Sequence, residues 1–251
     1  MGALHNGHLS LIDVAKQQAD VAICSIFVNP KQFNNPDDLK NYPIDTENDL
    51  TLLKNKSCDI VFLPTYEDIY FDDHINNYDL GGLDTVLEGK FRPGHFKGVA
   101  AVIDRFFNMV QPDKAFFGKK DYQQYLIVKQ LTKKLNLPVE IIGVETYREQ
   151  NGLAASSRNR LIPVDFKKYT GLLYDCLIYS KKNIKKLSVD EIKQEVLKRL
   201  NNSPFKIEYF EIVDGENLTA VEQYSNHHKI VACIAAYLGK VRLIDNMTLI
   251  G

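Results

Sequence analysis

The sequence lacks the features that mark several classes of protein. Its four cysteines, at positions 24, 58, 176 and 233, form no C-x-x-C pair and show no spacing typical of a zinc site. Its 31 basic and 32 acidic side chains nearly cancel, so no general attraction to nucleic acid or to an anionic membrane is expected. The longest apolar run, 230–238, is far shorter than the about 20 residues that a bilayer requires. We therefore expect neither a nucleic-acid partner nor a membrane partner.

What remains is the composition of an ordinary globular protein. The 251 residues are 45% apolar and 25% charged, with 14 Gly and 9 Pro. A chain of this length can bury roughly 70–75% of its unfolded surface, so it needs no disulfide or metal to fold. Free thiols in apolar runs, and the lack of a basic N-terminal segment followed by an apolar one, predict a reducing, cytoplasmic setting without a secretory signal.

Helical and strand patterns alternate between residues 9 and 144. Helical patterns cover 9–19, 45–56, 95–110 and 121–135, and short strand patterns cover 21–28, 59–63, 114–118 and 139–144. The first of these strands is almost wholly apolar and rich in β-branched residues, which predicts burial on both faces. The βαβα order predicts an α/β fold with a parallel sheet and helices on both faces.

The pattern changes after Pro163. Helices are expected over 165–183 and 189–201, followed by short strands over 206–213, 229–238 and 242–244. This order predicts a smaller α+β domain. The small and polar residues of 151–163 resemble a linker, and we place the boundary between a domain 1–150 and a domain 151–251.

Ligands of parallel sheets bind beyond the carboxyl ends of the strands, so the loops 29–35, 118–124 and 147–159 are candidate sites. The chain also opens on M-G-A-L-H-N-G-H, directly before a predicted helix. The N–H groups and partial positive charge of a helix N-terminus suit phosphate, and the imidazoles of His5 and His8 could stabilise charge on a leaving pyrophosphate. On these residues alone, a nucleotide site and a helix start without function are equally supported.

Two further segments carry candidate substrate ligands. In F-V-N-P-K-Q-F (27–33), Asn29 and Gln32 could bind a small polar substrate, although turns use the same residues. In F-R-P-G-H-F-K-G (91–98), Arg92 and His95 gather around glycines, which fits an anion site or a structural helix start.

Two more segments carry candidate phosphate ligands. In F-G-K-K-D-Y-Q-Q (117–124), one lysine could face a triphosphate, while Asp121 could cap the next helix and share a face with Gln124. In R-E-Q-N-G-L-A-A-S-S-R-N-R (148–160), two hydroxyls precede a guanidinium, which suits phosphate but also resembles a domain linker.

In this order, the motifs resemble the pantothenate synthetase, or pantoate–β-alanine ligase, family. The matching strings are M-G-A-L-H-N-G-H (1–8), S-I-F-V-N-P-K-Q-F (25–33), L-E-G-K-F-R-P-G-H-F-K-G-V (87–99), F-F-N-M-V-Q-P-D (106–113), F-G-K-K-D-Y-Q-Q (117–124) and R-E-Q-N-G-L-A-A-S-S-R-N (148–159). The last third matches less sharply, through A-A-Y-L-G (235–239) and R-L-I-D-N (242–246). The resemblance implies a Rossmann-like parallel-sheet domain of the H-x-G-H nucleotidyltransferase type, followed by a smaller α+β domain.

The resemblance also implies a reaction. Pantoate would attack the α-phosphorus of ATP to give pantoyl adenylate and pyrophosphate, and β-alanine would then attack the activated carbonyl to give pantothenate and AMP. Mg²⁺ is expected with the triphosphate, with protein ligands that the sequence does not identify. Cytoplasmic localisation and a homodimer are expected as well.

Site residues follow from the matched motifs. His8 is expected to be the proton donor, and His5 and Lys120 are the other expected catalytic residues. Gln32 and Gln124 are expected to hold pantoate, with Asn29, Arg92 and His95 on the substrate side. ATP is expected to contact Met1, Gly2, Ala3, Leu4, His5, Asn6, Gly7, His8, Gly118, Lys119, Lys120, Asp121, Tyr147, Ala155, Ser156, Ser157 and Arg158.

Alternatives stay open on the sequence. Other H-x-G-H adenylyltransferases share the first motif, and a nucleotide-binding protein without catalysis is a second possibility. In the resembled family a strand leads into M-G-A-L-H, so we expect the natural polypeptide to start upstream of Met1. Buried strands without a partner leave backbone groups unsatisfied, at about 1–3 kcal/mol each.

Overall fold

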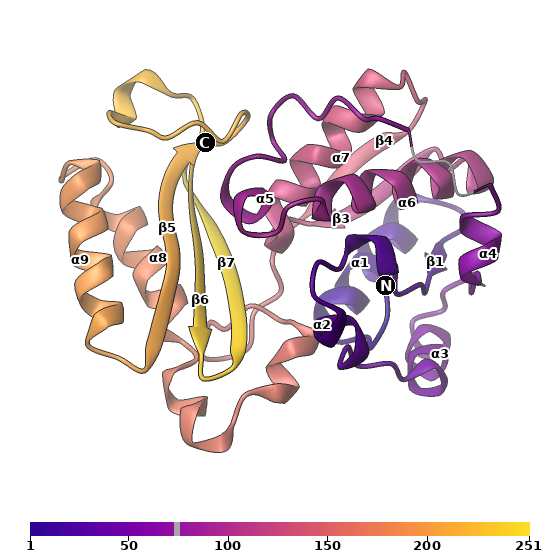
Figure 1. Cartoon of the computed structure of the whole chain (residues 1–251), viewed down its shortest axis with the longest axis horizontal. Helices are drawn as coiled ribbons and strands as arrows, with labels where there is room; N and C mark the ends of the chain where they lie inside the picture. The colour runs from indigo at the N-terminus through magenta and orange to yellow at the C-terminus, as the bar shows by residue number, and fades with distance from the viewer. Residues whose placement is uncertain (73–75) are drawn as a thin grey trace. The chain divides into compact units, whose positions relative to one another are not determined.

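The structure, a computed structural model, describes residues 1–72 and 76–251. The chain divides into two compact units, Met1–Thr146 and Tyr147–Gly251. The first unit has parallel strands with helices around them, and the second has an antiparallel sheet with helices on one face (Figure 1). None of the helices formed by the described residues is both long and apolar enough to span a bilayer.

The first unit contains most of the helices. Its elements are α1 (Asn6–Gln18), β1 (Ile23–Ser25), the 3₁₀ turn η1 (Pro30–Gln32), α2 (Pro36–Lys40), α3 (Thr46–Asn55), β2 (Ile60–Phe62), α4 (Tyr66–Ile69), α5 (Leu87–Phe91), α6 (His95–Val110), β3 (Lys114–Gly118), the 3₁₀ turn η2 (Lys119–Asp121), α7 (Tyr122–Lys134) and β4 (Glu140–Val144). The longest helix, α6, begins and ends where its apolar stripe predicts, and it packs against α7, α4 and η1.

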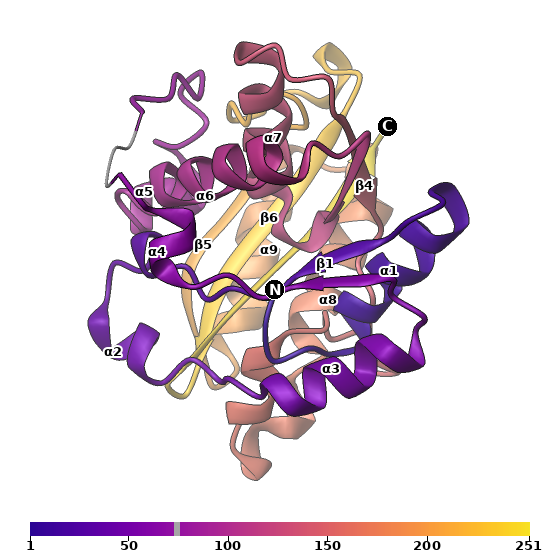
Figure 2. The same cartoon turned by 90° about the vertical axis from the view of Figure 1, so that its right-hand side faces the viewer.

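The parallel strands form two separate pairs rather than the one sheet that the βαβα order predicts. Strand β1 pairs with β2, and β3 pairs with β4. Met1 bonds to the end of β1 and to the segment that follows it: its amino group donates to Ser25 O at 2.7 Å, and its carbonyl accepts the Phe27 N–H at 3.0 Å. Figure 2 shows the N-terminus beside β1. No strand of the described residues joins β1 to β3.

Strand β1 is also shorter than expected and buried on one face only. Cys24 is fully buried in a small core with Leu4, Ile12 and Leu53, whereas Ile23 on the opposite face is 42% exposed. Its neighbour Ile60 is 49% exposed. The apolar run indicates a strand, but only one of its faces is covered by the described residues.

The second unit packs two helices on a three-stranded antiparallel sheet. Its elements are the 3₁₀ turns η3 (Ser157–Leu161), η4 (Val164–Tyr169) and η5 (Tyr224–Asn226), the helices α8 (Leu172–Asn183) and α9 (Val189–Asn201), and the strands β5 (Phe205–Asp214), β6 (Ile230–Leu238) and β7 (Val241–Ile250). The strand order is β5-β6-β7. The first expected helix therefore starts later, because 3₁₀ turns occupy its first residues, and the last strand is longer than expected.

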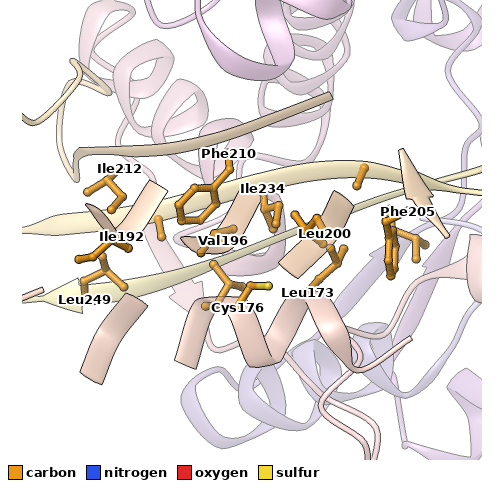
Figure 3. Close-up of a cluster of buried hydrophobic side chains, with 14 of the residues drawn as sticks. Leu173, Cys176, Ile192, Val196, Leu200, Phe205, Phe210, Ile212, Ile234 and Leu249 are labelled. Carbon is orange, nitrogen blue, oxygen red and sulfur yellow. The ribbon is translucent and has the colours of Figure 1, made fainter. Parts of the chain in front are cut away.

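The core of the second unit lies between the helices and this sheet (Figure 3). Helix α9 contributes Ile192, Val196 and Leu200, each four residues after the last, as a one-faced amphipathic helix requires. Alternate residues of β6, among them Ile234, face the same core. Burying these side chains stabilises the unit that holds residues 147–160.

Candidate functional site

The first predicted motif forms the entry to α1. His5 is the N-cap residue, and its Nδ1 accepts the Gly7 N–H at 3.1 Å. Its carbonyl accepts the N–H groups of His8 and Leu9, so these donors are used within the helix start rather than left free as the sequence suggested. The rings of His5 and His8 stack at a centroid distance of 4.0 Å. Because His5 Nδ1 accepts, a neutral His5 carries its proton on Nε2.

His8 is neutral in this environment. Burial lowers the pKa of its imidazole well below the ordinary value, and the nearby charges of His5 and Lys120 lower it further. Its Nδ1 is buried and has no hydrogen-bond partner in the part of the chain that the structure describes. Helix α1 packs against β3, the strand that leads into the G-K-K-D motif, so the H-x-G-H and G-K-K-D motifs belong to neighbouring elements of the first unit.

Asp49, which the sequence analysis did not single out, holds the N-terminal loop in place. This α3 residue is 1% exposed, and its Oδ1 accepts the Leu4 N–H at 2.6 Å. The preceding Ala3 has a left-handed backbone, with φ of 48°. Leu4 itself packs in the core, so the loop reaches His5 in one fixed conformation. The sequence could not single out Asp49, because only burial distinguishes it from Glu47, the exposed acidic residue of the same helix, and burial is not visible in a single sequence.

The loop after β1 is fixed against α6. His95 Nδ1 lies 2.7 Å from Gln32 O and donates to it, because a carbonyl oxygen only accepts. A Cβ on Gly98 would lie 2.2 Å from Lys31 O, so only glycine lets α6 approach this backbone. Burial, and secondarily the charge of Arg92, lowers the pKa of His95 to about 4. His95 is therefore neutral near pH 7, with Nε2 as an acceptor.

Asn29 supports this loop instead of facing a ligand. It is 2% exposed, and its Nδ2 donates to Gly98 O at 3.0 Å. Its Oδ1 accepts the hydroxyl of Tyr70 at 2.9 Å and the Lys31 N–H at 3.2 Å. The geometry thus favours a supporting role over the direct substrate contact expected from the sequence.

Gln123 and Gln124 are neighbours in the chain, but among the described residues only the side chain of Gln123 is hydrogen-bonded to the fold. Gln123 is buried, donates to Leu83 O and Val86 O at 2.6 and 2.8 Å, and accepts the Glu88 N–H at 2.9 Å. The side chains of Gln124 and Gln32, by contrast, have no hydrogen-bond partner among residues 1–72 and 76–251. Each motif therefore has one amide that builds the fold and one that is available to a ligand.

Three of the predicted charged site residues, Lys119, Lys120 and Arg92, each lie beside a carboxylate. Lys119 pairs with Glu145 at the end of β4, and Lys120 Nζ lies 3.3 Å from Asp121 Oδ1. Asp121 does not cap α7 with its side chain as expected, because its carboxylate faces this lysine. Arg92 lies 3.9 Å from Glu88, one helical turn earlier.

In the second unit, a tight hairpin carries the last predicted motif. The Ala155 N–H donates to Tyr147 O at 2.9 Å, and Arg148 and Ala154 form an antiparallel bridge. Ser156 Oγ accepts the Arg158 N–H at 3.3 Å and so starts η3, while Ser157 is buried. Tyr147 and the segment 155–158 are therefore neighbours within this unit.

Comparisons with known proteins identify the same family that the sequence motifs resemble. The family model described as Pantoate-beta-alanine ligase matches residues 1–248. A pantothenate synthetase of Azobacteroides pseudotrichonymphae is 45% identical over 250 residues, which is 99% of this chain and 89% of that protein. One from Cytophaga hutchinsonii is 44% identical over 253 residues, or 100% of this chain and 89% of that protein.

Solved structures show the same likeness. The pantothenate synthetase of Thermus thermophilus superposes with a TM-score of 0.94 at 37% identity, covering 100% of this chain and 91% of that one. The Francisella tularensis pantoate-beta-alanine ligase, crystallised with βγ-ATP and β-alanine, gives a TM-score of 0.81 at 35% identity, covering 99% and 87%. The chain belongs to the pantoate-beta-alanine ligase family, and it is an enzyme of the ligase class.

Proposed function

We propose that this ligase joins pantoate to β-alanine in two steps through a pantoyl adenylate. A carboxylate oxygen of pantoate attacks the α-phosphorus of ATP, and pyrophosphate leaves. The amine of β-alanine then attacks the acyl carbon, AMP leaves, and the nitrogen loses a proton. Adenylation is needed because a free carboxylate is a poor acylating agent. The Francisella tularensis relative was crystallised with an ATP analogue and β-alanine, which supports both substrates.

The observation that carries the assignment is the contrast between the paired amides. Asn29 and Gln123 use both the N–H and the C=O of their amides in contacts within the fold, whereas the Gln32 and Gln124 amides are available. Amides can orient a carboxylate by hydrogen bonds, whereas a tightly paired cation would also reduce its nucleophilicity. We propose that Gln32 and Gln124 hold pantoate and that His95 Nε2 and Arg92 act on the same substrate side.

We further propose that the first unit is a Rossmann-like H-x-G-H nucleotidyltransferase domain. Residues Met1–His8 and Gly118–Asp121 would contact ATP, with His8, His5 and Lys120 acting on the phosphates. A triphosphate next to His8 would raise the pKa of its imidazole, so His8 would become the proton donor when ATP binds. In the second unit, Tyr147 and Ala155–Arg158 would bind the nucleotide through backbone groups, hydroxyls and a guanidinium.

Mg²⁺ would enter with the triphosphate. Among the described residues, no group of three or more His, Cys, Asp or Glu side chains could hold a metal ion. Mg²⁺ usually keeps several waters and binds through phosphates with one or two carboxylates, so a dedicated protein cage is not needed.

We propose a homodimer on the family resemblance. Sedimentation would then give about twice the 28.7 kDa mass of one chain. A monomer at the concentrations that support activity would contradict this part of the proposal.

The experiment that tests the function is product detection with single omissions. The purified chain is mixed with ATP, pantoate and β-alanine, and AMP and pantothenate are measured. We expect both products only in the complete mixture, and ATP–pyrophosphate exchange when pantoate alone accompanies ATP. Exchange that depends on a mononucleotide instead of pantoate would indicate another adenylyltransferase. ATP binding without AMP release would indicate a protein without catalysis.

A further inference from the structure

The R-L-I-D-N motif in β7 has no role in the function proposed above, yet its aspartate is joined to the predicted ATP loop. Asp245, with a side chain that is 4% exposed, accepts two hydrogen bonds from the guanidinium of Arg148. The distances are 2.6 Å from Nη1 to Oδ2 and 2.9 Å from Nη2 to Oδ1. A bidentate fork of this kind fixes both the distance and the plane of the guanidinium.

The other contacts of Arg148 fix the hairpin that it begins. Its Nη1 donates to Gly152 O at 3.0 Å, its Nη2 donates to Asn246 O at 3.2 Å, and its guanidinium lies 4.5 Å from the ring centre of Tyr174. Gly152 has φ of 86°, and a Cβ there would lie 2.1 Å from the Tyr174 ring. Arg148 therefore ties β7, α8 and the hairpin turn together at one point.

The segment 156–158 follows directly from this anchored hairpin. Ala155 is bonded to Tyr147 on one side. On the other side, Asn159 donates to Ala154 O at 3.0 Å and to Glu149 Oε1 at 3.1 Å. Ser156, Ser157 and Arg158 are thus held between two fixed points, and the position of both depends on where Arg148 lies.

We propose that Asp245 is a positioning residue for the ATP-binding loop Ala155–Arg158 and acts through Arg148. The inference rests on the proposed function, because it takes this loop to bind ATP. Asp245 does not touch the substrates. It keeps the guanidinium of Arg148 in one orientation, and this orientation presents the hydroxyls and guanidinium of the loop to the phosphates before ATP arrives.

A second ion pair in the same sheet provides a matched control. Arg242, three residues before Asp245 in β7, donates through Nε to Glu208 Oε2 at 3.0 Å. This pair is also largely buried, with side-chain exposures of 18% and 14%. It joins β7 to β5 rather than to the hairpin 147–155, so Glu208→Gln removes a comparable carboxylate without releasing Arg148.

The test measures KM and kcat for ATP and for pantoate in pantoate-dependent ATP–pyrophosphate exchange. We expect Asp245→Asn to raise the KM for ATP about tenfold, equivalent to one displaced charge-assisted contact, and to leave the KM for pantoate within about twofold. Arg148→Lys keeps the charge but loses the fork, and it should give the same split. The double variant should be no worse than the poorer single variant, because both act on one contact. Glu208→Gln should change neither KM.

Two outcomes would overturn the inference. One is an Asp245→Asn enzyme with a wild-type KM for ATP. Another is an equal loss for ATP and pantoate that follows the drop in melting temperature, as a merely structural residue would give. If Asp245→Asn does not fold, Arg148→Lys alone decides between these outcomes. Arg158→Ala serves as the reference: should it too leave the KM for ATP unchanged, the ATP role of the loop fails, whereas wild-type exchange activity would still support the proposed ligase.

Discussion

At the scale of single residues, His8 must change its protonation state to act as a proton donor. In the free chain its imidazole is neutral, because burial lowers its pKa and the charges of His5 and Lys120 lower it further. We expect His8→Ala to slow pantoyl adenylate formation by about 10²–10³-fold, the range for a lost general acid and charge-stabilising group. Single-turnover formation of the adenylate is the measurement. A variant that forms it at the wild-type rate would refute the role.

If the side-chain amides of Gln32 and Gln124 hold pantoate, removing either one should change the KM for pantoate but not the KM for ATP. Gln124→Ala removes an amide that no described residue uses, so the fold should persist while the KM for pantoate rises strongly, by about tenfold or more. The KM for ATP should stay nearly unchanged, and Gln32→Ala should behave alike. The adjacent Gln123→Ala is the contrast, since it breaks three hydrogen bonds, two of them fully buried, and should lower the melting temperature instead. Equal losses for ATP and pantoate in Gln124→Ala would contradict the assignment.

The sequence located these motifs but did not assign each residue within them. Asn29 and Gln32 are three positions apart in one polar loop, and chemistry alone makes both good ligands. Their difference lies in long-range contacts, because the partners of Asn29 are Tyr70 and Gly98, which come much later in the chain. A single sequence does not show which distant backbone group reaches a side chain. It therefore cannot separate an amide that supports the loop, such as that of Asn29, from one that has no partner in the described residues, such as that of Gln32.

At the scale of elements, the contact between α6 and η1 determines where Gln32 lies. In Gly98→Ala, the new Cβ would meet the backbone of Lys31 at 2.2 Å, and backbone cannot swing away as a side chain can. We expect the loop to shift, the KM for pantoate to rise about tenfold, and stability to fall by about 1–3 kcal/mol, as overpacking typically costs. Urea unfolding and steady-state kinetics measure the two effects. Wild-type kinetics in this variant would show that the loop position does not matter to pantoate.

The link between α3 and the N-terminal loop makes a parallel prediction. Asp49→Ala removes the acceptor of the Leu4 N–H and leaves this buried donor unsatisfied, at about 1–3 kcal/mol. The loop before His5 should become mobile, so adenylate formation should slow by about tenfold or more. Asp49→Asn keeps an acceptor oxygen and should lose less. Glu47→Ala, exposed on the same helix, is the control, and equal rates in all three variants would reject the link.

At the scale of the whole molecule, local patterns predicted the elements better than their assembly. Helix α6 and strands β3 and β4 follow from apolar spacing and short apolar runs within a few residues of their observed ends. The pairing of strands depends on which edges meet, and this information is not local. The order βαβα therefore predicted parallel pairing correctly, while the division into two pairs, and the exposed face of β1 at Ile23, came only from the structure.

Two neutral histidines, the buried His95 and the half-buried His8, make the stability of the chain depend on pH. The pKa of His95 falls from its ordinary 6.5 to about 4 in the folded state, through burial and then Arg92, although the acidic Glu88 and Asp121 oppose the shift. The unfolded chain therefore binds the additional proton first as the pH falls below 6.5, and acid favours unfolding. His8 acts in the same direction.

The resulting prediction concerns the slope of stability against pH. The contribution of His95 to the free energy of unfolding is fully present above pH 6.5 and is lost as the pH falls toward 4. The difference of 2.5 between its pKa values in the unfolded and folded chain corresponds to about 3 kcal/mol. Urea unfolding of the wild type between pH 7 and pH 4 should therefore show a steeper fall in stability than that of His95→Asn, whatever the absolute stability of the variant. Since only the ionisation of His95 distinguishes the two slopes, equal slopes would mean that His95 is already exposed to protons in the native protein. That result would also remove the argument that its Nε2 is an acceptor for substrate at neutral pH.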